Sequence, residues 1–386
     1  MTLRDPSEEG RTATYLELFF DLVFVVTISA IASQWHHAIA GGDVASGLVS
    51  LAVVMFAVWW AWMGFTWFAN FFDTDDVAYR ILVFVQLLAS LGLASGIPFV
   101  FQDGDFRVMT VCYVVLRVAM SLQWLRAGRA NPQLRQYSLR WASGIWACQI
   151  FWVVFAFGHW PGAVAAVMVL VGCAGELAVP VWANRLPPGR RAVTHPEHIE
   201  ERYGLFTLII LGEMVLGASE AFNAALEDHA HSWPLVMAAV LCAVLAFLLW
   251  WLYFGFLGHY DLSDNRTAFI WGFGHYLVFA SLAAADGALG ALIDAIATTE
   301  SALPGWGIGL TLAAPVSVFL LIASLMRAAA GARLRGWWLR AAVVVLAAGA
   351  GAGSWGPVWA LAAVCVVLAV LLAAQIIDKA SGPRAG

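Results

Sequence analysis

Long apolar segments recur from one end of the chain to the other, and they constrain its fold more than any other feature. A helix needs about 20 predominantly apolar residues to cross a bilayer, and polar or Pro/Gly breaks separate twelve such segments here. They lie near residues 16–39, 46–70, 79–101, 106–127, 138–158, 160–183, 200–222, 234–258, 267–290, 306–329, 336–353 and 356–377. The sequence therefore predicts an all-α, polytopic integral membrane protein with about twelve transmembrane helices.

The composition of the chain excludes the main soluble classes. Only 12% of its residues are charged and 62% are hydrophobic, whereas a soluble domain carries about 25% charged residues. A net charge of −5 provides no basic surface for nucleic acid. The five cysteines all lie in apolar segments, so we expect buried free thiols rather than disulfides or metal ligands. We predict no nucleic-acid partner, no cofactor and no metal site.

The basic residues indicate how the spans are oriented. Twelve spans place both termini and every even-numbered connection on one side of the membrane, and 18 of the 20 Lys and Arg residues fall on that side. The other two are Arg107, on the opposite side, and Arg117, within a span. Since positive charge concentrates on the cytoplasmic face, we predict a plasma (inner) membrane protein with both termini in the cytoplasm.

The two halves of the chain resemble each other. Residues 59–65 (WWAWMGF) match residues 250–256 (WWLYFGF), about half the chain apart. An offset of six spans preserves orientation, so the pattern favours a parallel 6+6 repeat of the kind found in some transporters. The predicted organisation follows from this repeat: a cytoplasmic N-terminal segment (1–15), a first membrane half (16–183), a cytoplasmic connection (184–199), a second membrane half (200–377) and a cytoplasmic tail (378–386).

Four ionisable residues fall near the middle of predicted spans. They are Arg117, Glu176, Glu213 and His275. Ionisable groups are costly in the hydrocarbon region and usually face a bundle interior or a water-filled cavity. One interpretation is a polar cavity in which Glu213 and His275 carry protons while Arg117 and Glu176 support them. The alternative is a buried ion pair between Arg117 and Glu213 or Glu176 that only fixes helix register.

Glu17 and Asp21 form a second candidate group at the start of the first span. Their i, i+4 spacing places both carboxylates on one face of a helix. Such a pair could coordinate a cation or relay a proton. It could also simply occupy a favourable position near a positive helix N-terminus.

A histidine-rich stretch precedes the seventh span. In residues 195–201 (HPEHIEE), Pro196 suits the first turn of a helix, and the acidic residues after it suit a helix N-terminus. His198 and Glu201 at i, i+3 could share a metal, but the stretch contains no HExxH motif. We therefore predict no metal site here.

Two segments carry a resemblance to a known family. Residues 17–25 (ELFFDLVFV), and residues 198–207 (HIEERYGLFT) running on to 211–213 (LGE), resemble the two signatures of the bacterial low-temperature-requirement A family. The resemblance implies a polytopic membrane protein and attaches no catalytic role to any residue. Its characteristic polar positions fall on Glu17, Asp21, His198, Glu201, Arg202 and Glu213, with His198, Glu201 and Arg202 forming a cytoplasmic signature.

These features favour a secondary transporter or ion-coupled permease over an enzyme. Asp21, Glu213, His275 and Glu17 are the candidate ion- or proton-handling residues. The partners would be the lipid bilayer and a small molecule or ion of unspecified chemistry, and no oligomeric state is assigned. Two alternatives stay open: a membrane-embedded enzyme acting on lipid or isoprenoid substrates, and a non-catalytic stress or scaffold protein.

Overall fold

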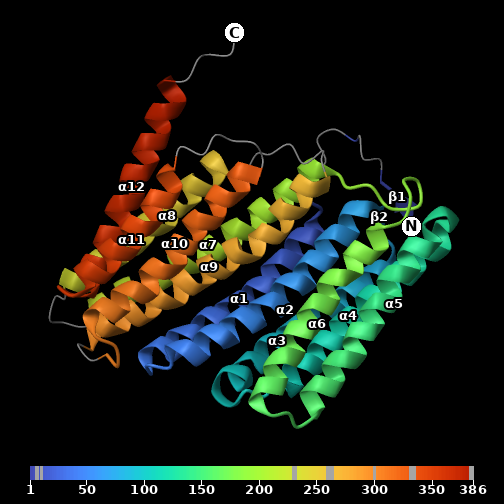
Figure 1. Cartoon of the computed structure of the whole chain (residues 1–386), viewed down its shortest axis with the longest axis horizontal. Coiled ribbons are helices and arrows are strands. Elements are labelled where there is room, and N and C mark those ends of the chain that lie inside the picture. Colours follow the sequence, from blue (N-terminus) through green and yellow to red (C-terminus); the bar gives the residue numbers. More distant parts are fainter. Residues whose placement is uncertain are drawn as a thin grey trace. The chain divides into compact units, whose positions relative to one another are not determined.

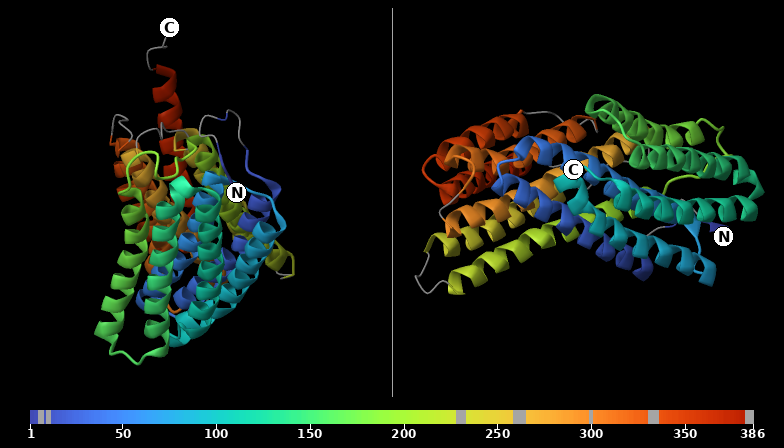
Figure 2. Two further views of the ribbon diagram at one scale, coloured as in Figure 1. Left: turned by 90° about the vertical axis from the view of Figure 1, so that its right-hand side faces the viewer. Right: turned by 90° about the horizontal axis from the view of Figure 1, so that it is seen from below.

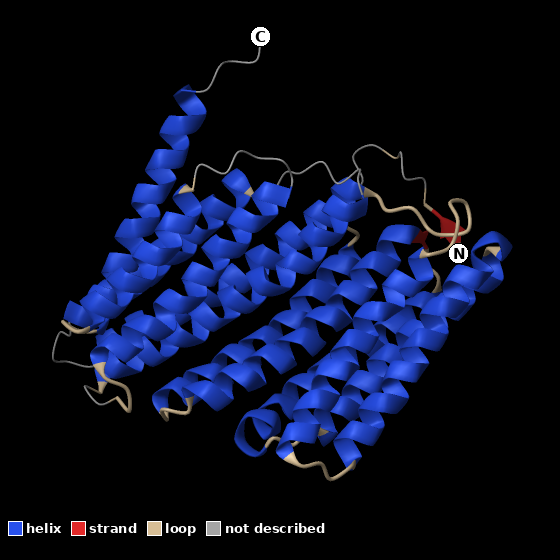
Figure 3. Ribbon diagram, in the orientation of Figure 1, coloured by secondary structure: helices blue, strands red, loops and turns tan. Residues whose placement is uncertain are grey.

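Twelve long helices account for nearly all of the described chain. The computed structural model describes residues 1–4, 8, 12–227, 233–257, 265–298, 301–329 and 336–381. The helices are α1 (Tyr15–Ala40), α2 (Val44–Phe71), α3 (Val77–Asp103), α4 (Arg107–Ala130), α5 (Arg135–Phe157), α6 (Gly162–Asn184), α7 (Pro196–Glu227), α8 (Trp233–Phe256), α9 (Asn265–Ala297), α10 (Gly305–Ala329), α11 (Trp337–Gly353) and α12 (Pro357–Ser381). Within the described residues, a 3-10 turn at Pro132–Leu134 and a two-residue antiparallel pairing of β1 (Thr2–Leu3) with β2 (Phe72–Asp73) complete the secondary structure (Figure 3).

The predicted all-α, multi-pass architecture is confirmed. Eleven of the described helices are long and apolar enough to cross a membrane, and α11 is shorter at 17 residues. The helix bounds follow the predicted spans closely because hydropathy and Pro/Gly breaks are local signals. Residues 382–386 of the predicted tail, and the basic residues Arg11, Arg333, Arg335 and Arg384, lie outside the described residues.

The seventh helix differs from its predicted bounds at both ends. It begins at Pro196 rather than near residue 200, and it continues to Glu227. Proline fits the first turn of a helix, where its missing N–H has no intrahelical acceptor to satisfy. His198 therefore lies in α7 and not in the connection that was predicted over residues 184–199.

The helices form two compact units, which divide α1, α2 and α7 between them. The first unit contains Met1–Ala30 and Ala52–Tyr203, and the second contains Ile31–Leu51 and Gly204–Gly386. In the first unit α3, α4, α5 and α6 pack in chain order, as do α9, α10, α11 and α12 in the second (Figure 1, Figure 2). The duplication of the two halves stays a prediction.

Close backbone contact joins α10 and α11 in the second unit. A Cβ atom added at Gly309 would collide with the carbonyl oxygen of Gly349, and one added at Gly353 would collide with that of Gly305. Small residues let membrane helices approach closely where no hydrophobic force drives them together. Glycine at these positions therefore sets the spacing of the two helices.

Candidate functional site

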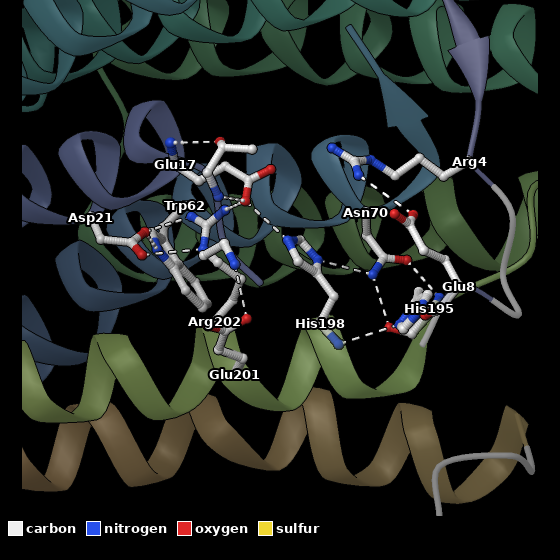
Figure 4. Close-up of polar contacts among 12 residues, drawn as sticks. Arg4, Glu8, Glu17, Asp21, Trp62, Asn70, His195, His198, Glu201 and Arg202 are labelled. Carbon is white, nitrogen blue, oxygen red and sulfur yellow. Dashed lines mark hydrogen bonds and ion pairs between the residues drawn. The ribbon is translucent and has the colours of Figure 1, made fainter. Parts of the chain in front are cut away.

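Four ionisable side chains from α1 and α7 meet inside the first unit (Figure 4). Glu17 and Asp21 come from α1, and His198 and Arg202 come from α7. Glu17 is 3% exposed and the other three are fully buried. These residues, called the α1–α7 quartet below, lie one turn apart on each helix, so both helices present a matched pair of groups to each other.

The start of α1 places Glu17. The Glu17 backbone N–H donates to the Thr14 hydroxyl at 3.3 Å, and the Thr14 N–H donates back to the Glu17 carboxylate at 3.1 Å. This reciprocal pair is a capping box, in which two otherwise unpaired N–H groups of the first turn are satisfied. Glu17 therefore caps the N-terminus of α1 and belongs to the quartet with the same side chain.

Asp21 is held by Arg202 and by a tryptophan from α2. Arg202 donates from NH2 to Asp21 Oδ1 at 2.6 Å and from Nε to Oδ2 at 3.1 Å. The Trp62 indole donates to Oδ1 at 2.7 Å, and the Arg202 NH1 atom lies 3.5 Å from Glu17 Oε2. Two parallel N–H···O bonds give a buried arginine–carboxylate pair both strength and a defined orientation. Arg202 thus connects the two acidic residues of α1.

The protonation of His198 follows from the Asn70 amide. His195 fixes that amide on both sides, since its N–H donates to Asn70 Oδ1 and its carbonyl accepts from Nδ2, each at 2.9 Å. The second Nδ2 proton of Asn70 then faces His198 Nδ1 at 3.1 Å. Because Nδ1 must accept this bond, the imidazole proton lies on Nε2, which donates to Glu17 at 2.9 Å. His198 is therefore neutral in this arrangement.

With His198 neutral, the quartet carries one excess negative charge. Glu17 and Asp21 each contribute one negative charge, Arg202 contributes one positive charge, and neutral His198 contributes none. A buried uncompensated charge is costly. Uptake of one proton or one monovalent cation would neutralise the cluster.

A second buried ion pair lies in the same unit, between α4 and α6. Arg117 donates to Glu176 at 3.0 Å, and the two side chains are 1% and 0% exposed. Glu176 also accepts from Trp60 at 2.9 Å, from Gln149 at 3.1 Å and from Tyr113 at 3.2 Å. Four donors satisfy this carboxylate as an anion, so the pair has no net charge. Of the two ion-pair alternatives raised by the sequence, the structure contains Arg117 with Glu176.

Helix α2 touches both clusters through neighbouring tryptophans. Trp60 donates to Glu176, while Trp62 donates to Asp21. Residues two apart on a helix point to nearly opposite sides. Helix α2 therefore separates the two acidic clusters. Gly64 on the same helix leaves room for the guanidinium, since an added Cβ would lie 2.8 Å from Arg117 NH1.

A family comparison extends over both clusters. The model of the bacterial low temperature requirement A protein (LtrA) matches residues 12–373. The chain belongs to the LtrA family. An uncharacterized protein of Rhizobium meliloti (strain 1021) is 28% identical over 259 residues, or 65% of this chain. The chain spans about 60% of the length of this curated relative.

Three further sequence candidates are not members of the quartet. In this LtrA-family protein Glu201 is half-buried and accepts from the Ala13 N–H at 2.9 Å. Glu213 and His275 belong to the second unit. Glu213 is half-buried and makes no hydrogen bond or ion pair with another described residue. His275 is fully buried, its Nδ1 lies 2.7 Å from the Trp271 carbonyl, and its Nε2 lies 2.8 Å from the Tyr253 hydroxyl.

Sequence reasoning missed the uncharged partners of the charged groups. Trp60 and Trp62 stood out only as part of the internal repeat, and Asn70 did not stand out at all. The available signal was that Asn70 is a lone amide near the end of an apolar span. No cluster of three or more His, Cys, Asp or Glu side chains suited to a metal occurs among the residues that the structure describes.

Proposed function

We propose that this LtrA-family membrane protein is an ion-coupled secondary transporter, with the α1–α7 quartet as its proton- or cation-binding site. One observation carries the proposal. Two carboxylates, one arginine and one neutral histidine are buried together, which leaves one negative charge without a compensating partner among the described residues of the quartet. A coupling ion is a species that binds such a site in one step of a cycle and leaves it in another.

Glu17 is the carboxylate on which we place the exchangeable proton. Asp21 accepts three hydrogen bonds, two of them from Arg202, and such bonding favours its ionised form. Glu17 reaches Arg202 only at 3.5 Å, and its Oε2 accepts from His198 Nε2 at 2.9 Å and from the Thr14 N–H at 3.1 Å. Protonation of Glu17 would neutralise the quartet and leave the Arg202–Asp21 pair in place.

The sequence candidates of the second unit rank below the quartet in this proposal. Glu213 stays a candidate ion-handling residue because it is an acidic residue in a span with no described partner. Both ring nitrogens of His275 are engaged, and its contacts with Tyr253 and Trp271 support a role in joining α8 to α9. A neutral replacement at Glu213 is therefore a comparison worth making beside one at Glu17.

The experiment is ion flux in proteoliposomes of purified protein. A trapped pH dye reports proton entry and radioactive sodium reports cation entry, each driven by an imposed gradient. We expect wild-type flux of one ion, and a loss of at least about tenfold in Glu17→Gln, because Gln keeps the hydrogen-bonding shape but cannot take up a proton. Asp75→Asn is the control, since Asp75 is an exposed carboxylate paired with Arg80.

Two results would contradict the proposal. One is a Glu17→Gln protein that incorporates normally and carries full flux. The other is a wild-type protein that moves neither ion under either gradient. A scaffold role, in which the quartet only fixes helix register, predicts instead that Glu17→Gln changes folding yield alone.

We propose a plasma membrane location with both termini in the cytoplasm. The support is the distribution of Lys and Arg, 18 of 20 on the side of the termini. Impermeant thiol labelling of cysteines introduced at Asp103 and at Arg185 tests it. We expect Asp103→Cys to react from outside intact cells and Arg185→Cys only after lysis, and the reverse pattern would overturn the orientation.

A further inference from the structure

The first unit contains a cavity at the ends of α3, α4 and α5. Its volume is about 370 Å³, and it is lined by residues 103–107, residues 155–160 and Ala165. Asp103, Asp105 and Arg107 give it a charged rim. Arg107 donates to Asp105 at 2.6 Å, and these bonds, together with one from the Arg107 backbone N–H, lower the Asp105 pKa to about 2. Asp105 is therefore ionised at neutral pH and pairs with Arg107.

A smaller cavity lies one turn deeper, between α2, α4, α5 and α6. Its volume is about 30 Å³, and its walls include Phe56, Thr110, Tyr113, Trp152 and Cys173. A cavity holds a water molecule once it offers roughly 10–15 Å³ and polar partners. Thr110 and Tyr113 supply hydroxyl groups, and the buried Trp152 indole N–H has no acceptor among the described residues. The space therefore suits one or two water molecules.

Phe106 is the wall that the two cavities share. It lines both of them and immediately precedes the first residue of α4, Arg107. Its ring packs against Phe155 with centroids 5.3 Å apart and planes at 62°. The Trp160 indole donates to the Phe155 carbonyl at 3.0 Å, which ties the last turn of α5 to the loop that follows it. One aromatic side chain thus separates the charged rim from the deeper cavity.

Tyr113 connects the deeper cavity to the Arg117–Glu176 pair. Tyr113 lines the cavity and its hydroxyl lies 3.2 Å from Glu176 Oε1. Arg117, one turn further along α4, is 1% exposed and its Nε has no acceptor among the described residues. The buried pair therefore retains an unused donor close to the end of the path.

We propose that these two cavities form a water-accessible entry path from the 103–107 and 157–161 loops to the Arg117–Glu176 pair, with Phe106 controlling its width. The ligand of this path is water, and with it the proton. The path would let protons or water reach the acidic cluster on the far side of α2 from the quartet. Its use in transport rests on the proposed function, whereas its accessibility to water does not.

Thiol accessibility tests the path directly. In a full-length chain with its five cysteines replaced by serine, Thr110→Cys places a thiol in the deeper cavity. Silver ion, a water-sized probe that binds thiolates, is added from the side of the 103–107 loop. The readout is protection from a fluorescent maleimide applied after denaturation. Met120→Cys is the matched control, because Met120 lies on the same helix, is 1% exposed and lines neither cavity.

We expect Thr110→Cys to react at least about a hundredfold faster than Met120→Cys, because a thiol without water does not ionise. Phe106→Ala should raise the rate at which silver reacts with Thr110→Cys about tenfold, and Phe106→Trp should lower it. The reason is that the size of the side chain at position 106 limits how easily silver enters the deeper cavity. Phe157→Ala, which changes only the outer cavity, should leave the rate unchanged. If Thr110→Cys does not fold, a chain retaining only Cys173 replaces it.

Two results would overturn the entry path. One is protection of Thr110→Cys and Cys173 equal to that of Met120→Cys. The other is faster reaction from the opposite face of the membrane. If silver reaches Thr110→Cys as expected in a protein that shows no ion flux, the entry path is upheld and the transporter proposal is rejected. Failure of the path and failure of the transporter proposal are therefore distinguishable.

Discussion

Arg202→Gln and Arg80→Gln remove the same kind of ion pair from different surroundings. Arg202 binds Asp21 through Nε and NH2 at 3.1 and 2.6 Å, and Arg80 binds Asp75 through the same two nitrogens at 2.7 Å each. The first pair is fully buried, whereas the second is 63% and 65% exposed. The two substitutions therefore compare burial at nearly constant geometry.

The expected magnitudes differ severalfold. Losing one partner of a buried pair costs about 3–5 kcal/mol, because the remaining charge stays buried without compensation. Arg202→Gln leaves both Asp21 and Glu17 uncompensated, so we expect a loss of about 4 kcal/mol, or about a thousandfold in the unfolding equilibrium. Arg80→Gln should cost less than about 1 kcal/mol, because an exposed pair is screened by water.

Equilibrium unfolding in mixed micelles measures both values. The fraction of sodium dodecyl sulfate is raised in a mild detergent while far-ultraviolet circular dichroism reports helix content. The double variant Arg202→Gln/Asp21→Asn should recover part of the loss, since it removes one of the two stranded charges. Equal effects of Arg202→Gln and Arg80→Gln, within about 1 kcal/mol, would refute the reasoning from burial.

Three further predictions follow from individual contacts. Gly349→Ala should destabilise the protein by about 1–3 kcal/mol, because its Cβ would lie 2.5 Å from Ala313 Cβ; Gly351→Ala in the same helix meets nothing within 4 Å and should be neutral or stabilising. His275→Phe should cost about 1–3 kcal/mol by removing the buried hydrogen bond with the Tyr253 hydroxyl, and Tyr253→Phe should relieve part of that cost in mixed-micelle unfolding. Because Arg107 lowers the Asp105 pKa to about 2, this carboxylate adds stability above its ordinary pKa of 3.8 and loses it as the pH falls through 2. Carbon-13 NMR of labelled Asp105 should show a pKa moved toward 3.8 in Arg107→Gln, and an unchanged pKa would rule out Arg107 as the cause.

Local pattern was enough to predict the helices. Their apolar length, the Pro and Gly breaks and the first-turn proline at residue 196 are properties of neighbouring residues, and the observed bounds follow them. The i, i+4 spacing of Glu17 and Asp21 likewise placed both carboxylates on one helix face, where the structure finds both beside Arg202. Family membership also followed from contiguous motifs.

Only the tertiary structure decided which helices meet and hence which charges pair. Asp21 and Arg202 are 181 residues apart, and no local pattern distinguishes Arg202 from Arg117 as the partner of Asp21. The same is true of the tryptophans on α2, which resemble lipid-facing aromatics in sequence but donate to Asp21 and Glu176. Hydropathy is a sum over adjacent residues, whereas pairing depends on packing between distant segments, where each buried polar atom must find its own partner.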